Sequence, residues 1–194
     1  MAKLTIASVR KAMPGVEVFH LTDADTPMVE GADGVKRVDV KLPMAVRRMM
    51  HNAQLDGDWL LIDCDIIIKK DVRHVFDESF DVALTDRIGT DMEGTSYGKA
   101  MPFNMGVAFS RSPAFWQRVI RHMSSLPMDL QSWTGDQLVV CAMVRQGLAD
   151  DFKVKILPGL TYNYPPLSVD DPRMENAAIV HFKGARKKFI KEAA

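Results

Sequence analysis

Two aspartates, Asp63 and Asp65, lie within an apolar, isoleucine-rich stretch at residues 59–68. A stretch of this length and composition predicts a strand that is buried on both faces of a mainly parallel sheet. Residues i and i+2 of a strand point to the same side, so both carboxylates would project together from an apolar wall. Burying two like charges is costly, and a divalent cation with an anionic ligand would offset that cost. The alternative is a strand that ends at Ile62, after which both aspartates only cap a turn.

The bulk composition is that of a globular protein, with room for one domain over residues 1–194. Hydrophobic residues make up 47% of the chain and charged residues 26%. Basic and acidic residues number 25 each, which argues against a nucleic-acid binder that works through a global positive field. Cys64 and Cys141 lie in apolar segments and indicate buried thiols in a reducing compartment, so we expect a cytoplasmic protein.

No apolar run in the sequence reaches the length of a transmembrane segment, so we expect none. The short basic segment at residues 186–191 would give at most a weak peripheral contact with an anionic membrane. A solvated helix end is the simpler interpretation of that segment. From the charge balance we expect no nucleic-acid partner.

Strand and helix patterns alternate along the chain. Apolar alternation predicts strands at residues 16–21, 35–40, 59–68, 80–85, 103–109, 152–157 and 178–182. Helical spacing predicts helices at residues 2–12, from 43, at 71–76, from 113 and at 137–145. Thr134 and Gln137 fit a capping box for the last of these. The alternation predicts an α/β fold with a mostly parallel sheet flanked by helices, whose ligands bind beyond the carboxyl ends of the strands.

Four short motifs follow one another in the sequence. They are Asp63-Cys64-Asp65, Phe103-Asn104-Met105-Gly106-Val107, Gly135-Asp136-Gln137 and His181-Phe182-Lys183-Gly184-Ala185-Arg186-Lys187. Together they resemble the GT-A glycosyltransferases. The last motif, His-x-x-Gly-x-x-Lys after a strand, is most similar to glycosyltransferase family eight, the glycogenin and bacterial galactosyltransferase group. The resemblance runs from about residue 42 to residue 187, and it implies the GT-A (Rossmann-like) fold and hexosyltransferase activity.

The resemblance implies a metal and donor site. In it, Asp63, Asp65 and His181 would bind a divalent cation, Mn²⁺ or Mg²⁺, and Asp63 would also contact the donor nucleotide. Two carboxylates and an imidazole suit Mn²⁺ and leave positions open for phosphate oxygens. Gly184 would let the backbone approach the diphosphate, and Lys187 would bind its terminal phosphate.

The resemblance also implies a sugar pocket. Asn104, Asp136 and Gln137 would line the sugar and acceptor site as catalytic residues, and Arg47 would contact the sugar donor. The donor would be a nucleotide sugar, UDP-linked in this family, and the acceptor a carbohydrate or glycoconjugate. The family retains anomeric configuration. A metal and a lysine on the diphosphate would stabilise the negative charge that grows as the sugar–phosphate bond breaks.

Several of these residues have simpler interpretations. His181 could be an ordinary strand-end histidine, and Lys187 belongs to a basic run that is typical of a solvated face. Gln137 could only cap its helix. The aromatic loop at residues 162–166 could stack against an acceptor sugar or pack over the sheet.

Two other functions compete with the glycosyltransferase hypothesis. The chain also resembles haloacid-dehalogenase phosphatases, with residues 150–151 or 170–171 as the late acidic pair, but residues 181–187 then stay unexplained. The second rival is a glycosyltransferase-like domain that binds without turnover. It is motivated by residues 2–12: the GT-A fold normally begins with a strand whose end holds the nucleotide base, and a helix is predicted there. We therefore expect that first strand to be missing, through an incomplete N-terminus or a reduced base site.

Overall fold

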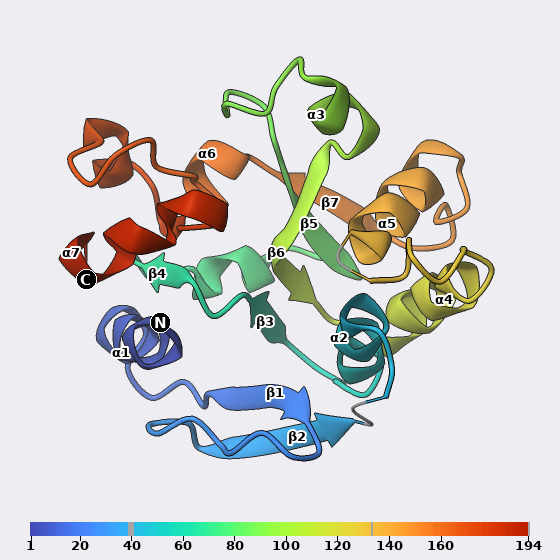
Figure 1. Ribbon diagram of the computed structural model, residues 1–194, viewed down its shortest axis with the longest axis horizontal. Coiled ribbons are helices and arrows are strands. Elements are labelled where there is room, and N and C mark those ends of the chain that lie inside the picture. Colours follow the sequence, from blue (N-terminus) through green and yellow to red (C-terminus); the bar gives the residue numbers. More distant parts are fainter. Residues whose placement is uncertain (39–40, 133, 194) are drawn as a thin grey trace.

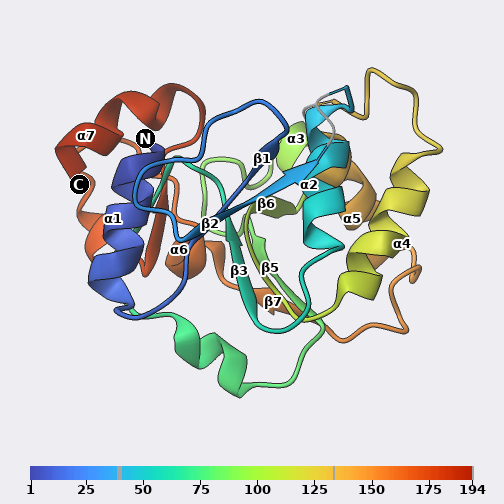
Figure 2. The ribbon, with the colours of Figure 1, turned by 90° about the horizontal axis from the view of Figure 1, so that it is seen from below.

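The central sheet has four strands, in the order β3 (Trp59–Ile62), β6 (Phe103–Ser110), β5 (Val82–Asp86) and β7 (Val154–Leu157). The computed structural model describes residues 1–38, 41–132 and 134–193. Helices lie on both sides of this sheet, as Figures 1 and 2 show. The predicted α/β class is confirmed. Every residue of β6 is buried, and this strand lies in the interior of the central sheet.

The strand directions differ from the expected mostly parallel sheet. Strand β6 runs antiparallel to both β3 and β5, and only β5 and β7 pair in parallel within the central sheet. The reason lies in residues 87–102, which carry only the short helix α3 (Ser96–Ala100). Such a connection returns the chain to the same end of the sheet, whereas a parallel neighbour needs a crossover to the other end.

Two smaller sheets flank the central one. Strands β1 (Phe19–Asp23) and β2 (Gly34–Val38) pair in parallel, and β4 (Ile66–Ile68) pairs antiparallel with β8 (Ile179–His181). The second predicted strand extends to residues 39–40, which lie outside the described residues. The β1–β2 ribbon lies beside β3 in Figure 1 without pairing to it.

A single strand is predicted for residues 59–68, but the structure forms two strands there. Strand β3 ends at Ile62, residues 63–65 form a turn, and β4 begins at Ile66. The Asp63 N–H still donates to the Gly106 carbonyl at 2.9 Å, after which the chain turns away to pair with β8. The same-face argument for Asp63 and Asp65 was therefore wrong, and a turn sets their relative placement.

The predicted helices are present, with small changes in their bounds. The α-helices besides α3 are α1 (Ala2–Ala12), α2 (Met44–Asn52), α4 (Pro113–Met123), α5 (Gly135–Arg145), α6 (Gly159–Tyr162) and α7 (Ile190–Ala193). Short 3-10 helices occupy Arg73–Asp77, Pro172–Glu175 and Gly184–Phe189. The predicted capping box at α5 does not form, because Thr134 makes no side-chain cap and Gln137 instead accepts a bond from Arg87.

Two main apolar clusters hold these layers together. Helices α2, α4 and α5 bury residues such as Met49, Trp116 and Val140 against one face of the central sheet. Val9 of helix α1 and Met13, which follows that helix, pack with Ile66 and other residues on the opposite side. None of the helices in the described part of the chain has both the length and the apolar character needed to cross a bilayer.

Candidate metal and donor site

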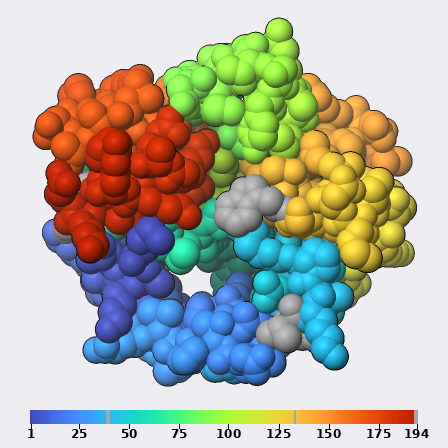
Figure 3. Space-filling view, viewed as in Figure 1, coloured from blue at the N-terminus to red at the C-terminus, as the bar shows by residue number. Residues whose placement is uncertain are grey.

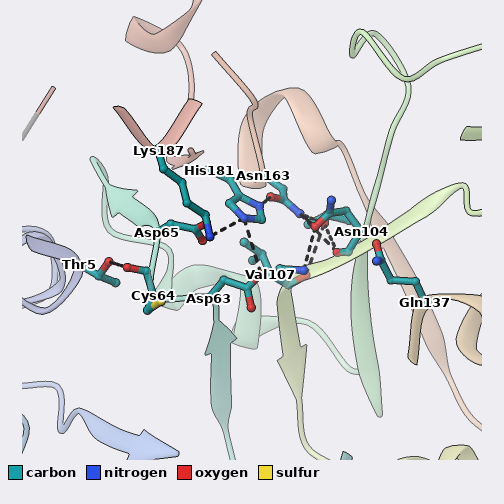
Figure 4. Close-up of polar contacts among 12 residues, drawn as sticks. Thr5, Asp63, Cys64, Asp65, Asn104, Val107, Gln137, Asn163, His181 and Lys187 are labelled. Atoms are coloured by element: carbon teal, nitrogen blue, oxygen red, sulfur yellow. Dashed lines mark hydrogen bonds and ion pairs between the residues drawn. The ribbon is translucent and has the colours of Figure 1, made fainter. Parts of the chain in front are cut away.

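Asp63, Asp65 and His181 converge at one point of the fold (Figure 4). His181 Nε2 lies 3.2 Å from Asp65 Oδ1 and 3.6 Å from Asp63 Oδ2. One ligand atom from each of the three residues lies within 4.8 Å of the other two. Residues separated by more than a hundred positions in the sequence are therefore placed to hold a single ion.

The pairing of β4 with β8 brings the histidine to the aspartates. Ile66 lies opposite His181 in the ladder, so His181 is next to Asp65, the residue that precedes the strand. The Phe182 N–H donates to the Asp65 carbonyl at 2.9 Å and continues the pairing into the turn. Apolar residues on both strands are buried, and their burial fixes this register.

The remaining contacts of each aspartate suit a cation between them. Arg48 Nη2 contacts Asp63 Oδ1 at 2.6 Å, and Lys187 Nζ contacts Asp65 Oδ2 at 3.2 Å. Each carboxylate thus has one oxygen paired with a basic side chain and the other oxygen turned toward His181. Two carboxylate oxygens and an imidazole nitrogen form a ligand set that fits Mn²⁺ or Mg²⁺.

Charge at this point keeps Asp65 ionised. Burial works to raise its pKa, but the hydrogen bonds and charges of a protonated His181 and of Lys187 outweigh burial and lower the pKa to about 2. The Asp65 side chain is 6% exposed, whereas that of Lys187 is 39% exposed. The lysine therefore reaches the buried carboxylate from the solvent side, where an anionic ligand would approach.

Gly184 begins the 3-10 helix that carries Lys187. Its φ of +62° lies in the left-handed region that favours glycine, and a Cβ there would meet no heavy atom within 4 Å. Within the chain itself, the glycine is needed for its backbone conformation. Its predicted approach to a diphosphate stays a prediction.

Arg48 is a site residue that the sequence analysis missed. Besides Asp63 it binds Asp136, with Nη1 at 2.9 Å from Oδ2. Burial raises the pKa of Asp136, and the charge of Arg48 opposes that rise. Arg48 lies three residues after Ala45 and four before Asn52, so it shares a helix face with two residues that the structure buries.

Arg47, the residue chosen from the sequence, points elsewhere. Its Nη1 lies 3.2 Å from Asp23 Oδ2, at the end of β1. It still lines the cavity described below, so its contact with a donor stays a prediction.

Asn104 and Gln137 are held by neighbouring side chains. Asn104 Oδ1 accepts from the Gly106 N–H at 2.8 Å and from Asn163 Nδ2 at 3.1 Å. Gln137 Oε1 accepts from Arg87 Nη2 at 2.7 Å. The structure thus ties Asn104 to the His181 region through Asn163, while Gln137 is engaged with a buried arginine. Their roles toward a sugar stay predictions.

The aromatic loop does not present a stacking surface. Tyr164 is 2% exposed, and its hydroxyl donates to Asp171. Tyr162 packs edge-on against Phe109, with ring centroids 6.1 Å apart. The loop's contribution to the site is instead Asn163, whose Oδ1 lies 2.8 Å from His181 Nδ1. The sequence pattern of this loop had pointed only to its aromatic residues.

A cavity of about 960 Å³ opens beside Asp63, between α1, β1, α2 and β3. In the space-filling view it is the hollow between the N-terminal segment and the β3 region (Figure 3). Apolar residues such as Phe19 and Leu61 line it, together with Arg47 and Asp63. This volume is within the usual range for small-molecule and cofactor sites, so a nucleotide could fit.

Cys64 also lines this cavity. It is exposed, whereas the sequence analysis had predicted a buried thiol; Cys141 is buried as expected, and both cysteines are free. The turn at residues 63–65 explains the difference, because it takes Cys64 out of the strand core.

Neither late acidic pair of the phosphatase hypothesis joins the described cluster of Asp63 and Asp65. Asp151 pairs with Arg118 at 2.6 Å. Asp171 accepts from Tyr164 and Arg173. The residue that does join the two aspartates is His181, which that hypothesis leaves unexplained.

Known proteins match this chain by structure and not by sequence. No protein-family model matches the chain, and no curated protein matches it in sequence. A glycosyltransferase involved in glycosylation of the major capsid of PBCV-1 is 11% identical, with a TM-score of 0.59 over 92% of this chain and 99% of that one. The galactosyltransferase LgtC, solved with donor and acceptor sugar analogues, is 16% identical, with a TM-score of 0.60 over 99% of this chain and 91% of that one.

The glycosyltransferase GlyE of Streptococcus pneumoniae TIGR4 is 15% identical, with a TM-score of 0.61 over 95% of this chain. This chain spans about half of GlyE, 52% of its length. At these identities the similarity establishes the fold, which is that of the GT-A glycosyltransferases.

Proposed function

We propose that this chain is a metal-dependent glycosyltransferase that transfers a sugar from a nucleotide-sugar donor to an acceptor. The observation that carries the proposal is the convergence of Asp63, Asp65 and His181 next to Lys187. It occurs in a fold shared with glycosyltransferases, beside a cavity of nucleotide size. Neither fold nor acidic cluster would be sufficient alone, since folds host many functions and acidic clusters are common.

The chain's own residues would divide the work. Asp63, Asp65 and His181 would hold the ion, which when bound supplies a Lewis acid for the diphosphate leaving group. Lys187 would stabilise the terminal phosphate, where negative charge grows as the sugar–phosphate bond breaks. Asn104, Asp136 and Gln137 would line the sugar and acceptor side, with Arg48 orienting Asp136.

The finer assignments follow the resemblance to family eight. They are a UDP-linked donor, Mn²⁺ as the ion, retention of anomeric configuration, a carbohydrate or glycoconjugate acceptor and one domain over residues 1–194. The proposal also keeps a cytoplasmic location, in line with two free cysteines.

The test measures UDP release from a panel of UDP-sugars with Mn²⁺, and its loss on addition of EDTA. Asp65→Asn should lower the rate by about 100-fold or more, because it removes a charged ligand of the ion. Asp151→Asn is the matched control, since this aspartate pairs with Arg118 away from the cluster. It should leave the rate unchanged.

Other outcomes would point to the rival functions. UDP-sugar binding without UDP release would favour a binding domain. Rapid hydrolysis of an aryl phosphate with Mg²⁺, sensitive to Asp151→Asn, would favour the phosphatase.

A further inference from the structure

The geometry points to Asn163 as a positioning residue that fixes the tautomer of His181, so that Nε2 offers a lone pair to the ion. Asn163 Oδ1 lies 2.8 Å from His181 Nδ1 in the interior of the protein (Figure 4). The inference rests on the proposed metal site. It concerns the loop residue between two tyrosines, which no motif in the sequence analysis included.

A chain of hydrogen bonds starts from a backbone donor whose role is certain. The Gly106 N–H can only donate, so the Asn104 side-chain atom 2.8 Å away must be its oxygen. That oxygen lies 3.1 Å from the Asn163 side chain, which must therefore present its NH₂ group there. The same NH₂ group donates to Thr85 Oγ1 at 2.7 Å.

The orientation of Asn163 then decides the state of the imidazole. With its NH₂ group committed, Asn163 has only its carbonyl oxygen left for His181. His181 Nδ1 must carry a hydrogen to donate to that oxygen. In a neutral ring this leaves Nε2 without a hydrogen, as a metal ligand requires.

The other side of the ring favours the opposite tautomer when no ion is bound. Nε2 faces Asp65 Oδ1 at 3.2 Å and Asp63 Oδ2 at 3.6 Å, and both oxygens would accept a hydrogen from it. Asn163 is thus the contact that opposes a proton on Nε2. Removing it should let the proton move to Nε2, where it would compete with the ion.

Burial makes this network decisive. Thr85, Asn104, Asn163 and His181 are all at most 8% exposed, so water cannot readily replace a lost partner. Gly106 makes room for the ring, because a Cβ there would lie 2.2 Å from His181 Cε1. The ring is therefore fixed in position by packing and in protonation pattern by Asn163.

The first experiment reads the tautomer directly in the metal-free protein. Nitrogen chemical shifts of the His181 ring, assigned by their loss in His181→Gln, distinguish a hydrogen on Nδ1 from one on Nε2. They are recorded at a pH at which these shifts show a neutral ring. The native protein should carry the hydrogen on Nδ1, and Asn163→Ala should carry it on Nε2. Asn163→Asp keeps an acceptor for Nδ1 and should retain the native pattern.

The second experiment measures Mn²⁺ affinity from the electron paramagnetic resonance signal of the free ion. Asn163→Ala should weaken binding by roughly 10- to 100-fold, the usual effect of removing a partner that orients a metal ligand. Asn163→Asp keeps the acceptor for Nδ1 but loses the donor bonds to Asn104 and Thr85, so it should weaken binding less than Asn163→Ala does. Ser110→Ala is the matched control, since it removes another buried side-chain bond of β6, from Trp116 Nε1 at 2.7 Å. It should change neither tautomer nor affinity.

The outcomes separate this inference from the proposed function. A native protein that binds no Mn²⁺ overturns the metal site itself. A native protein that binds Mn²⁺ while Asn163→Ala keeps both the native tautomer and the native affinity overturns the role of Asn163. Equal weakening by Ser110→Ala would also overturn it, because general loss of stability would then account for the effect.

Discussion

At the scale of single residues, the site depends on how each charge is paired. Arg48 joins two carboxylates that belong to different motifs, Asp63 of the candidate metal cluster and Asp136 at the start of α5. The Asp136 side chain is only 2% exposed. An isolated buried carboxylate is far less stable than a paired one, so Arg48 holds this part of the site together.

The first prediction concerns this pair. Arg48→Met should lower the free energy of unfolding by about 3 kcal/mol, because it leaves the buried Asp136 without its charged partner, with only the Gln137 N–H still donating to it. Adding Asp136→Asn to Arg48→Met should recover part of that loss, since the stranded charge is gone. Urea unfolding of both single variants and the double variant measures the coupling.

Arg47→Met is the control for that cycle, because Arg47 lies on the same helix and its ion pair among the described residues is with Asp23, away from Asp136. It should cost clearly less than Arg48→Met. Strictly additive effects of Arg48→Met and Asp136→Asn would show that the two residues are not coupled.

At the scale of elements, the loop that carries Asn163 is fixed by its neighbours. The Tyr164 N–H donates to the Ile179 carbonyl, and the His181 N–H donates to the Tyr164 carbonyl at 2.8 Å. Asp171 completes this arrangement by accepting from the Tyr164 hydroxyl at 2.6 Å. Residues 163–164 are thus attached to β8, the strand that presents His181.

The second prediction is a pH dependence of this attachment. Hydrogen bonds from Arg173, together with those of Leu167 and Tyr164, hold the pKa of Asp171 below its ordinary value despite burial. A carboxylate with a lowered folded pKa stabilises the fold fully above its unfolded pKa, near 4, and loses that contribution as the pH falls toward the folded pKa. The midpoint temperature of thermal unfolding should therefore fall less steeply for Asp171→Asn than for the native protein as the pH is lowered from about 5 to about 2.

The neutral-pH comparison supplies the control for that experiment. Asp171→Asn should already be less stable there, since the native carboxylate is fully ionised and bonded. Parallel pH curves for the two proteins would contradict a contribution from Asp171 ionisation.

At the scale of the whole molecule, the protein is divided at the cavity. The central sheet ends at β3, and the β1–β2 ribbon lies near β3 without pairing to it (Figure 1). Residues of both β1 and β3 line the cavity. All residues of β1 are half-buried, whereas all residues of β6 are buried. A two-stranded ribbon has little stability of its own, so this part should open more readily than the centre.

The third prediction follows from that division. Amide hydrogens of β1 and β2 should exchange at least about 100-fold faster than those of β6, because local opening of the ribbon needs less free energy than global unfolding. Hydrogen-exchange mass spectrometry measures this. Adding Mn²⁺ with UDP should slow exchange at residues 59–63 if the cavity is the donor site. Equal exchange in the ribbon and the centre would show one cooperative unit.

The sequence by itself determined the class of fold and the three residues of the acidic and histidine cluster, Asp63, Asp65 and His181. Periodicity located the helices and most strands, since burial of an apolar face imposes its period on the chain. The ordered motifs predicted that Asp63, Asp65, His181 and Lys187 belong to one site. In the structure the two aspartates and His181 form a cluster, and Lys187 contacts Asp65.

Tertiary structure decided what local patterns leave open. Strand direction depends on which end of the sheet a connection reaches, so the antiparallel placement of β6 was not readable from its apolar run. The choice of Arg48 over its neighbour depends on which helix face is buried. The contact between Asn163 and His181 joins two segments through the pairing of a loop with β8. Packing decides which residues distant in sequence become hydrogen-bond partners, and the periodicity of one sequence does not identify them.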